Sequence, residues 1–281
     1  MILKLFVLLW LSLCGIQSVP VLSRNEATYE ETVSKIRELS LGLPDERVGE
    51  AVSKWSAEST TNPEELGSYF EGDILTVPEE PGRNGINGSY FRWHDGVIPF
   101  VIEETDFNET EVQSILAAIA DYHSKTCLRF VEYDGNQTDY ISIQGGNTGC
   151  WSGVGRLGGK QTVNLQPPNC IRRFGVIIHE LMHTVGFYHE QSRIDRNDYV
   201  TINWENVDIT KFHNFLTMPN SYAYGVDYDY GSVMHYTENS FSSNGNNTID
   251  TKPPGIPIGQ REGFGIIDLE KINLMYNCTV Q

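Results

Sequence analysis

Basic residues and long apolar runs are both scarce in this sequence of 281 residues. The 20 Lys and Arg residues are outnumbered by 37 Asp and Glu residues, which gives a formal net charge of −17. Such a chain repels the phosphates of nucleic acids, so we expect no nucleic-acid partner. Beyond the N-terminal residues, no stretch approaches the roughly 18 apolar residues that a membrane-spanning helix needs. We therefore expect no integral membrane association.

The N-terminus has the pattern of a secretory signal peptide. Lys4 is followed by an apolar run over residues 5–14 and then by small and polar residues. A positive start, a short apolar core and small residues near the cleavage point are typical of such a leader. We predict a signal peptide at residues 1–18 and a secreted, extracellular product. The alternative is a buried N-terminal helix.

Cysteine is sparse, with five residues in the chain. Cys14 would leave with the leader, and four cysteines would remain in the mature protein: Cys127, Cys150, Cys170 and Cys278. An even number of cysteines in a secreted chain indicates two disulfides, for which three pairings are possible.

Five Asn-x-Ser/Thr sequons support secretion weakly, because single sequons arise easily by chance. We predict glycosylation at four of them. These four are Asn108, Asn136, Asn246 and Asn277.

Residues 19–83 differ in composition from the rest of the chain. They contain no cysteine, are rich in Asp and Glu, and end in the Pro- and Gly-containing stretch 77–83. A polar segment between a leader and a cysteine-bearing domain is typical of a removable pro-segment, and we expect it to be flexible. The alternative is a small helical domain or a linker. The remaining chain, residues 84–281, has the patterns of one compact domain.

Apolar periodicity in that domain predicts a mixture of strands and helices. Gly-rich alternation is typical of hairpins, and Thr110 is a candidate helix cap. The expected elements are strands over 97–102 and 140–143, hairpins or an edge strand within 145–165, and helices over 110–124, 174–186 and 267–275.

Three histidines follow the spacing of a metal site in the motif HELMHTVGFYH. His179 and His183 are four residues apart, so on a helix they project from one face and can bind the same zinc ion. Glu180 lies beside them, within reach of a proton on a metal-bound water. Gly186 can adopt the positive φ that ends the helix and turns the chain. His189 then returns as a third ligand.

Three neutral ligands leave one coordination position of zinc open for water, as in catalytic rather than structural sites. The spacing is that of the metzincin metalloproteases, which also need a methionine-bearing turn. Ser232-Val-Met-His-Tyr236 fits that turn through Met234. The phenol of Tyr236 is a candidate weak ligand and oxyanion donor.

With these motifs the chain resembles the astacin family of zinc metalloproteases. The resemblance covers about residues 70–281, and a zinc motif that ends in His-Glu is specific to this family among metzincins. The motifs that carry it are His179–Glu190 and its continuation to Val200, Ser232–Tyr236, Gly149–Arg156, and Trp93 with the Val-Ile-Pro that comes after it.

The resemblance implies a zincin-like α+β fold. We expect an N-terminal twisted mixed sheet with two helices, one of which binds zinc. An active-site cleft and a loop-rich C-terminal subdomain with a terminal helix would come next. The upper subdomain would be 84–189 and the lower one 190–281. Substrate would lie extended along an edge strand near Trp151–Leu157, held by backbone hydrogen bonds.

The resemblance also implies roles for single residues. Glu180 would be the general base and acid, and Glu190 would meet the new N-terminus of the mature enzyme. Tyr236 would swing away from the metal to stabilise the tetrahedral intermediate. The ligands of the one zinc ion would be His179, His183, His189 and Tyr236. The disulfides would be Cys127–Cys278 and Cys150–Cys170.

For the pro-segment, the resemblance implies an inhibitory contact. The stretch Phe70-Glu-Gly-Asp73 matches the family's F-x-G-D motif, whose aspartate sits on the zinc and displaces the catalytic water. Gly72 permits a close backbone approach. A trypsin-like protease would activate the enzyme by cutting between Arg83 and Asn84.

Two features depart from the family pattern. Asn87 lies in the segment that the family buries after activation, where a glycan would hinder docking, so either Asn87 is unglycosylated or the docking differs. The chain also ends three residues after Cys278, without the EGF- or CUB-like modules that are common in relatives. We therefore expect a minimal, freely diffusing, monomeric protease.

Taken together, the residues predict a secreted zinc metalloendopeptidase made as a latent zymogen, with proteins or peptides as substrates. One alternative is a catalytically silent zinc-binding protein that acts through its cleft. Another is a disulfide-framed structural or inhibitory module, which leaves the histidine motif without an explanation.

Overall fold

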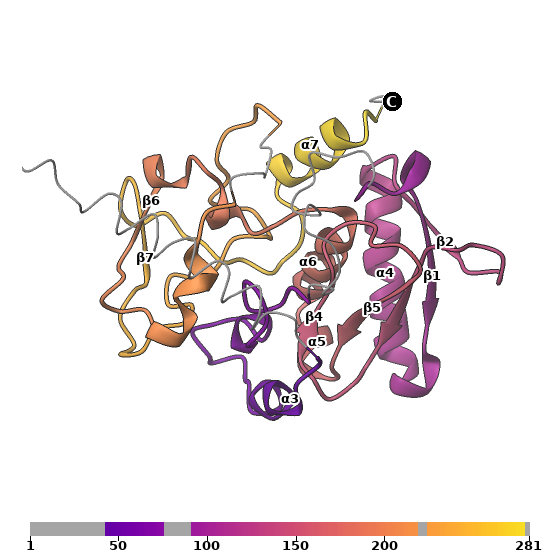
Figure 1. Ribbon diagram of the computed structural model, residues 1–281, viewed down its shortest axis with the longest axis horizontal. Coiled ribbons are helices and arrows are strands. Elements are labelled where there is room, and N and C mark those ends of the chain that lie inside the picture. The colour runs from indigo at the N-terminus through magenta and orange to yellow at the C-terminus, as the bar shows by residue number, and fades with distance from the viewer. Residues whose placement is uncertain (1–42, 76–90, 219–223, 279–281) are drawn as a thin grey trace, which may run out of the picture. The chain divides into compact units, whose positions relative to one another are not determined.

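The computed structural model describes residues 43–75, 91–218 and 224–278 of the chain (Figure 1). The helices are α3 (Glu46–Ser53), α4 (Glu109–Lys125), α5 (Asn169–Arg172), α6 (Phe174–Val185) and α7 (Ile266–Met275), and the strands are β1 (Val97–Ile102), β2 (Arg129–Glu132), β3 (Tyr140–Gln144), β4 (Cys150–Trp151), β5 (Lys160–Leu165), β6 (Val200–Ile202) and β7 (Ile249–Thr251). Short 3₁₀ turns connect several of these elements.

Five strands form a mixed sheet in the order β2-β1-β3-β5-β4. The first four are parallel, and β4 runs antiparallel to β5. The expected strands over 97–102 and 140–143 are confirmed as β1 and β3, whose apolar side chains, such as Ile98 and Ile141, are fully buried. The expected edge strand within 145–165 is also confirmed, because β4 ends the sheet. The short strand β2 was not predicted from the sequence.

Helix α4 begins after Asn108, and the expected cap at Thr110 is wrong. The Asn108 side chain accepts a hydrogen bond from the Glu111 backbone N–H at 3.1 Å. The Glu111 carboxylate accepts in return from the Asn108 backbone N–H at 2.9 Å. This reciprocal pair is a capping box, which satisfies two N–H groups that the helix itself leaves unpaired.

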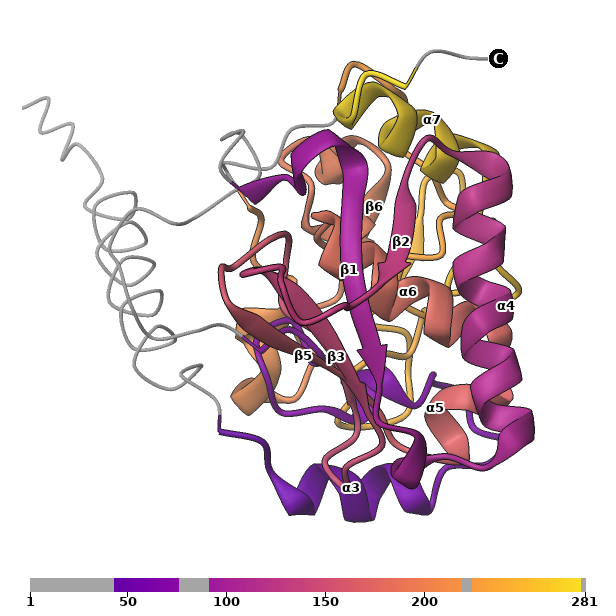
Figure 2. The same ribbon diagram turned by 90° about the vertical axis from the view of Figure 1, so that its right-hand side faces the viewer.

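Helix α6 lies in the interior, next to both the sheet and α4 (Figure 2). Its residues from Gly175 to Val185 are all buried. The Tyr122 hydroxyl of α4 donates to the Ile178 carbonyl at 2.9 Å, which ties the two helices together. The expected end of the helix is confirmed, because Gly186 has φ 130° and its N–H closes the last turn. A buried, rigid helix is a suitable support for a precise site.

The chain after α6 is rich in loops and contains the two-stranded β6–β7 ribbon and the terminal helix α7. A second hydrophobic cluster, which includes Phe215, Tyr228 and Tyr236, lies in this part of the chain. Figure 1 shows β6 and β7 away from the five-stranded sheet, with α6 between them. This arrangement agrees with the expected α+β fold with a loop-rich C-terminal part.

Both expected disulfides are present. Cys127 pairs with Cys278 and so ties the chain after α4 to the end of α7. Cys150 pairs with Cys170 and joins the edge strand β4 to α5. None of the helices in the described ranges is both long and apolar enough to cross a membrane.

The expectation of a flexible pro-segment is wrong for residues 43–75, which are folded against the rest of the chain. Their helix α3 buries Val52, and its backbone is held by amide side chains from beyond β5. The Asn169 amide donates to the Val52 carbonyl at 2.7 Å. The Gln166 amide donates to the Gly49 carbonyl at 3.0 Å. Sequence patterns did not reveal these partners because each lies 117 residues away along the chain.

Several predicted features fall outside the described residues. They are the signal peptide at 1–18, the cleavage point between Arg83 and Asn84, and the sequon at Asn87. The other four sequon asparagines are exposed, so each is open to modification. Glycosylation stays a prediction.

The Asn108 cap gives a test of the fold. We expect Asn108→Ala to lower the free energy of unfolding by about 1 kcal/mol, because the first turn of α4 loses a hydrogen-bond acceptor. Asn108→Asp keeps the acceptor and removes the sequon, so it should stay close to wild type. Denaturant unfolding of unglycosylated, oxidised protein measures both values. Equal losses in the two variants would contradict the capping role.

Candidate metal centre

Three imidazoles meet in the interior of the protein. His179 and His183 project from α6 one helical turn apart, and the turn at Gly186 brings His189 back toward them. All three side chains are buried. Asp73 joins them, and one ligand atom from each of the four residues lies within 4.8 Å of the others. The predicted histidine triplet and the predicted aspartate therefore converge on one point.

In two of the imidazoles, hydrogen bonds determine which ring nitrogen faces the place where the four candidate ligands converge. His179 Nδ1 lies 2.8 Å from the Val233 carbonyl oxygen. His183 Nδ1 lies 2.7 Å from the Phe187 carbonyl oxygen. A carbonyl oxygen only accepts, so each Nδ1 carries the proton and each Nε2 keeps its lone pair for a metal. Such outer hydrogen bonds orient histidine ligands in metal sites.

The Asp73 carboxylate lies among the three Nε2 atoms. Its Oδ2 is 3.0 Å from His179 Nε2 and 3.3 Å from His189 Nε2, and its Oδ1 is 3.4 Å from His183 Nε2. The neighbouring Gly72 has φ 89°, and a side chain there would meet the ring of Phe241 at 2.8 Å. Glycine is therefore required for the tight approach of this segment.

The donor set fits a zinc ion. Asp73 Oδ1, His183 Nε2 and His189 Nε2 are buried and have no hydrogen-bond partner within the described ranges. Three imidazoles and one carboxylate oxygen are a four-coordinate donor set of the kind that zinc prefers. The group can hold one zinc ion, as expected from the sequence.

The charges of the site are strongly coupled. Burial raises the pKa of the Asp73 carboxyl, but the imidazoles of His189 and His183 outweigh it and hold that pKa well below its usual range. Burial lowers the pKa of His189, but Asp73 and Glu71 raise it to about 9. A metal cation would take the place of the proton that the raised pKa of His189 favours on Nε2.

Glu180 lies next to the ligands on α6 and is fully buried. Neither of its carboxylate oxygens has a hydrogen-bond partner in the described part of the chain. Burial raises the pKa of this carboxyl well above its ordinary value, and the Asp73 carboxylate adds to the rise. A cation on the three imidazoles would lower this pKa again. An unpartnered carboxylate beside a metal is suited to exchange a proton with water.

The predicted methionine turn supports the site from beside α6. The Val233 carbonyl holds His179, and Met234 is buried. Asp268 of α7 holds the turn in place, because its carboxylate accepts from the Ser232 hydroxyl at 2.6 Å and from the Val233 N–H at 2.9 Å.

Tyr236, at the end of the turn, packs beside His189 with ring centroids 4.5 Å apart. Its hydroxyl donates to the Glu71 carbonyl at 2.5 Å. In this structure the hydroxyl of Tyr236, the predicted additional ligand, is thus bound to the segment that carries Asp73. Its reversible role at the metal stays a prediction.

Glu190 is buried and fully paired. Its carboxylate accepts from Lys271 of α7, from Arg193 at 3.2 Å and from the Asp229 N–H at 2.9 Å. The predicted contact with a new N-terminus would add to these partners or replace one of them. That contact stays a prediction.

The expected substrate edge is occupied by residues next to Asp73. The Ser152 N–H donates to the Asp73 carbonyl, and the Leu75 N–H donates to the Ser152 carbonyl, both at 2.9 Å. Ile74 and Ser152 thus form a parallel bridge directly after β4. An extended substrate would pair with this edge in the same way, and the expected substrate position stays a prediction.

Residues 43–75 have a second anchor that the sequence did not predict. Arg261 is buried, and its Nε donates to the Glu64 carboxylate at 2.5 Å. The Glu65 carboxylate accepts from the Thr237 N–H at 2.8 Å and from its hydroxyl at 2.7 Å. No sequence pattern marks these residues, because the paired positions are 197 and 172 residues apart.

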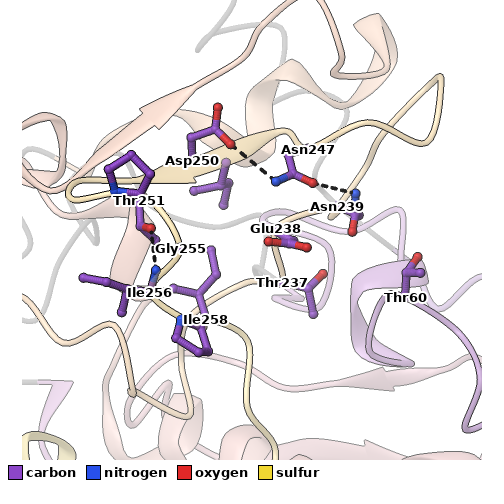
Figure 3. Close-up of a pocket in the computed structure, with 13 residues that line it drawn as sticks. Thr60, Thr237, Glu238, Asn239, Asn247, Asp250, Thr251, Gly255, Ile256 and Ile258 are labelled. Atoms are coloured by element: carbon purple, nitrogen blue, oxygen red, sulfur yellow. Dashed lines mark hydrogen bonds between the residues drawn. The ribbon is translucent and has the colours of Figure 1, made fainter.

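The loops after Tyr236 line a cavity of about 550 Å³ (Figure 3). Its polar wall includes Asn239, Asn247 and Asp250, which hydrogen-bond to one another. Thr60 from the N-terminal segment also lines it. None of the four candidate metal ligands lines this cavity.

The fold and the three-histidine centre together place the chain in the zincin class of metalloproteinase folds. Residues 85–277 match the peptidase family described as Astacin. Zinc metalloproteinase nas-4 of Caenorhabditis elegans is 40% identical over 225 residues, which are 76% of this chain and 70% of that protein. The chain therefore belongs to the astacin family.

Other relatives are longer. Zinc metalloproteinase nas-13 of Caenorhabditis elegans is 42% identical over 226 residues, which are 79% of this chain and 49% of that protein. Meprin A subunit beta of Rattus norvegicus is 43% identical over 223 residues, 77% of this chain and 30% of that protein. The chain thus spans about half of the first of these relatives and less than a third of the second.

Solved structures agree with this placement. High choriolytic enzyme 1, a hatching enzyme zinc-protease from Oryzias latipes, superposes with a TM-score of 0.62 at 41% identity, covering 67% of this chain and 94% of that chain. Myroilysin superposes with a TM-score of 0.50 at 16% identity over 68% of this chain and 98% of that chain, and this match speaks for the fold alone.

Metal content gives a direct test of the centre. We expect one zinc ion per chain, and we expect His183→Ala to bind zinc far more weakly because one of three imidazole ligands is lost. His94→Ala, at an exposed histidine outside the centre, should keep the full content. Elemental analysis after dialysis against a weak chelator measures both. Full zinc content in His183→Ala would contradict the assignment.

Proposed function

We propose that this chain is a secreted zinc endopeptidase that is made as a latent precursor. One observation carries the proposal: the Asp73 carboxylate lies among the three Nε2 atoms of the histidine motif. A carboxylate in that position excludes the water that a hydrolase needs. Residues 43–75 therefore belong to an inhibitory pro-segment that is removed by cleavage after Arg83.

The residues around the metal support peptide hydrolysis. When bound, zinc would polarise the scissile carbonyl and lower the pKa of the attacking water. Glu180 accepts the proton of that water and returns it to the leaving amine. Tyr236, released from its bond to the pro-segment, donates a hydrogen bond to the developing oxyanion.

Two further contacts support latency. The bridge between Ile74 and Ser152 covers the edge strand where an extended substrate would bind. The Glu64–Arg261 pair holds the pro-segment on the C-terminal part of the chain. Substrate and pro-segment thus compete for the same surfaces, and cleavage at Arg83 resolves the competition in favour of substrate.

The two disulfides support an oxidising, extracellular location, together with the leader pattern at residues 1–18. Activation would generate a new N-terminus at Asn84, which we propose docks near Glu190. The buried ammonium of Lys271 already neutralises that carboxylate. Docking would therefore require the Glu190 network to rearrange.

A catalytically silent zinc-binding protein is the competing function. It would need the metal ligands without the proton acceptor, yet Glu180 is present and buried beside them. Cleavage of a generic protein substrate by Arg83-processed protein, with and without a zinc chelator, separates the two. Zinc-loaded, processed protein without chelator-sensitive hydrolysis would refute the endopeptidase proposal.

The general base gives the first functional prediction. We expect Glu180→Gln to keep its zinc and to lower kcat by about 100-fold or more, because the amide cannot accept the proton. Steady-state kinetics and elemental analysis on the same processed sample measure both properties. A variant with full turnover and full zinc would show that another group takes the proton.

The pro-segment gives the second functional prediction. We expect Asp73→Ala to raise the activity of the unprocessed chain, because water can then reach the metal. Glu50→Ala, at an exposed position of α3, should leave the precursor silent. An additional Arg83→Gln substitution prevents cleavage during the assay. If both precursors were equally silent, Asp73 would not be the inhibitory group.

A further inference from the structure

The three imidazoles of the centre differ in what holds their outer nitrogens. His179 and His183 donate to backbone carbonyls at Val233 and Phe187, both of which belong to the protease domain. These two partners remain in place when the pro-segment is removed. The orientation of two ligands is therefore permanent.

The third imidazole depends on the pro-segment instead. His189 Nδ1 lies 2.7 Å from the Oε2 atom of Glu71, and the His189 backbone N–H donates to the same oxygen at 3.3 Å. Glu71 is 1% exposed, so this bond is shielded from water. It is the one outer bond to the three imidazoles, among those seen in the described residues, that pairs a ring with a carboxylate.

The backbone of Glu71 makes a second contact with the site. Its carbonyl accepts the hydroxyl of Tyr236 at 2.5 Å. Glu71 has φ 48°, in the left-handed region, which aims its side chain at His189 while its carbonyl faces Tyr236. The residue before the glycine and aspartate of the motif thus holds two groups of the protease at once.

We propose that Glu71 is a positioning residue of the latent metal centre. Its carboxylate fixes the tautomer and orientation of His189, strengthens zinc binding in the precursor, and leaves with the pro-segment on activation. This inference rests on the proposed function, because it takes residues 43–75 to be removed. It assigns the pro-segment a task besides blocking water: retention of the metal before activation.

The physical reason lies in the basicity of the ligand. An imidazole whose Nδ1–H donates to a carboxylate is a stronger donor at Nε2 than one that donates to a neutral carbonyl. In the buried centre this bond also keeps the ring from rotating away from the metal. After cleavage, water or another group replaces Glu71, and the third ligand is held less firmly.

Zinc release from the full-length precursor tests the proposal. We expect Glu71→Gln, which keeps the size of the side chain but loses its charge, to weaken zinc binding by about 10-fold to 100-fold, the usual effect of losing a hydrogen-bond partner of a metal ligand. The measurement is zinc transfer to a chromogenic chelator, with Arg83→Gln present in every protein to prevent cleavage. Unchanged zinc affinity in Glu71→Gln would overturn the proposal.

A matched variant separates positioning from general loosening of the pro-segment. Glu64→Gln alters another buried glutamate of the same segment, which pairs with Arg261 rather than with an imidazole of the centre. It should retain zinc like the wild type. If Glu64→Gln released zinc as readily as Glu71→Gln, the effect would come from a loosened segment and the assignment of Glu71 would fail.

A measurement on the unmutated chain removes dependence on the folding of any variant. With ¹⁵N-labelled histidine, the zinc-loaded precursor should show slowly exchanging Nδ1–H signals from all three ligands. After cleavage and removal of the pro-segment, the signal of His189 should shift or vanish while those of His179 and His183 persist. Three unchanged signals would contradict the proposal.

The outcomes for the two proposals are distinguishable. If the processed wild type shows chelator-sensitive proteolysis and the precursor does not, the proposed function stands, whatever Glu71→Gln does to zinc. If Glu71→Gln loosens zinc but processed protein never cleaves substrate, the positioning role stands and the endopeptidase proposal fails.

Discussion

The contact between Asp73 and three buried imidazoles is the constraint on which the rest of the structure depends. Four ionisable groups in the interior are costly unless each is paired or bound to a metal. Several parts of the chain contribute the contacts that satisfy these groups. The turn at Val233 holds His179, and Asp268 of α7 holds that turn. The terminal helix is therefore part of the metal centre, although it contributes no ligand.

The same constraint explains why residues 43–75 are folded. An aspartate reaches the interior only if the segment around it is held on both sides. Helix α3 lies on amide groups such as that of Asn169, and Glu64, which lies between α3 and Asp73 along the chain, pairs with Arg261. Gly72, which lacks a side chain, lets the backbone next to Asp73 pass close to the ring of Phe241. Composition alone suggested a flexible segment, because the partners that order it are distant in sequence.

The sequence predicted well those features that depend on local spacing. The histidines one helical turn apart on α6, the glycine that ends the helix and the strands β1 and β3 all follow from periodicity within a few residues. The family resemblance supplied Asp73 and the two disulfide pairings. Features that depend on distant packing were missed, including β2 and Arg261. The true cap of α4 was missed by two residues, because Asn108 and Thr110 are both good caps and only the geometry separates them.

Removal of residues 43–75 would leave several polar groups of the remaining chain without a hydrogen-bond partner. The amide of Asn169, the guanidinium of Arg261, the hydroxyl of Tyr236 and the backbone of Ser152 would each lose a partner that the precursor provides. Buried or half-buried groups without partners cost free energy, so the surface left after such removal would favour any ligand that restores these bonds. In the proposed mechanism, an extended peptide would restore those at Ser152, and a developing oxyanion would restore the one at Tyr236. In the proposed function, the pro-segment and the substrate would therefore be held by the same kinds of hydrogen bond. They would differ at the metal, where Asp73 brings a carboxylate and a substrate would bring a carbonyl.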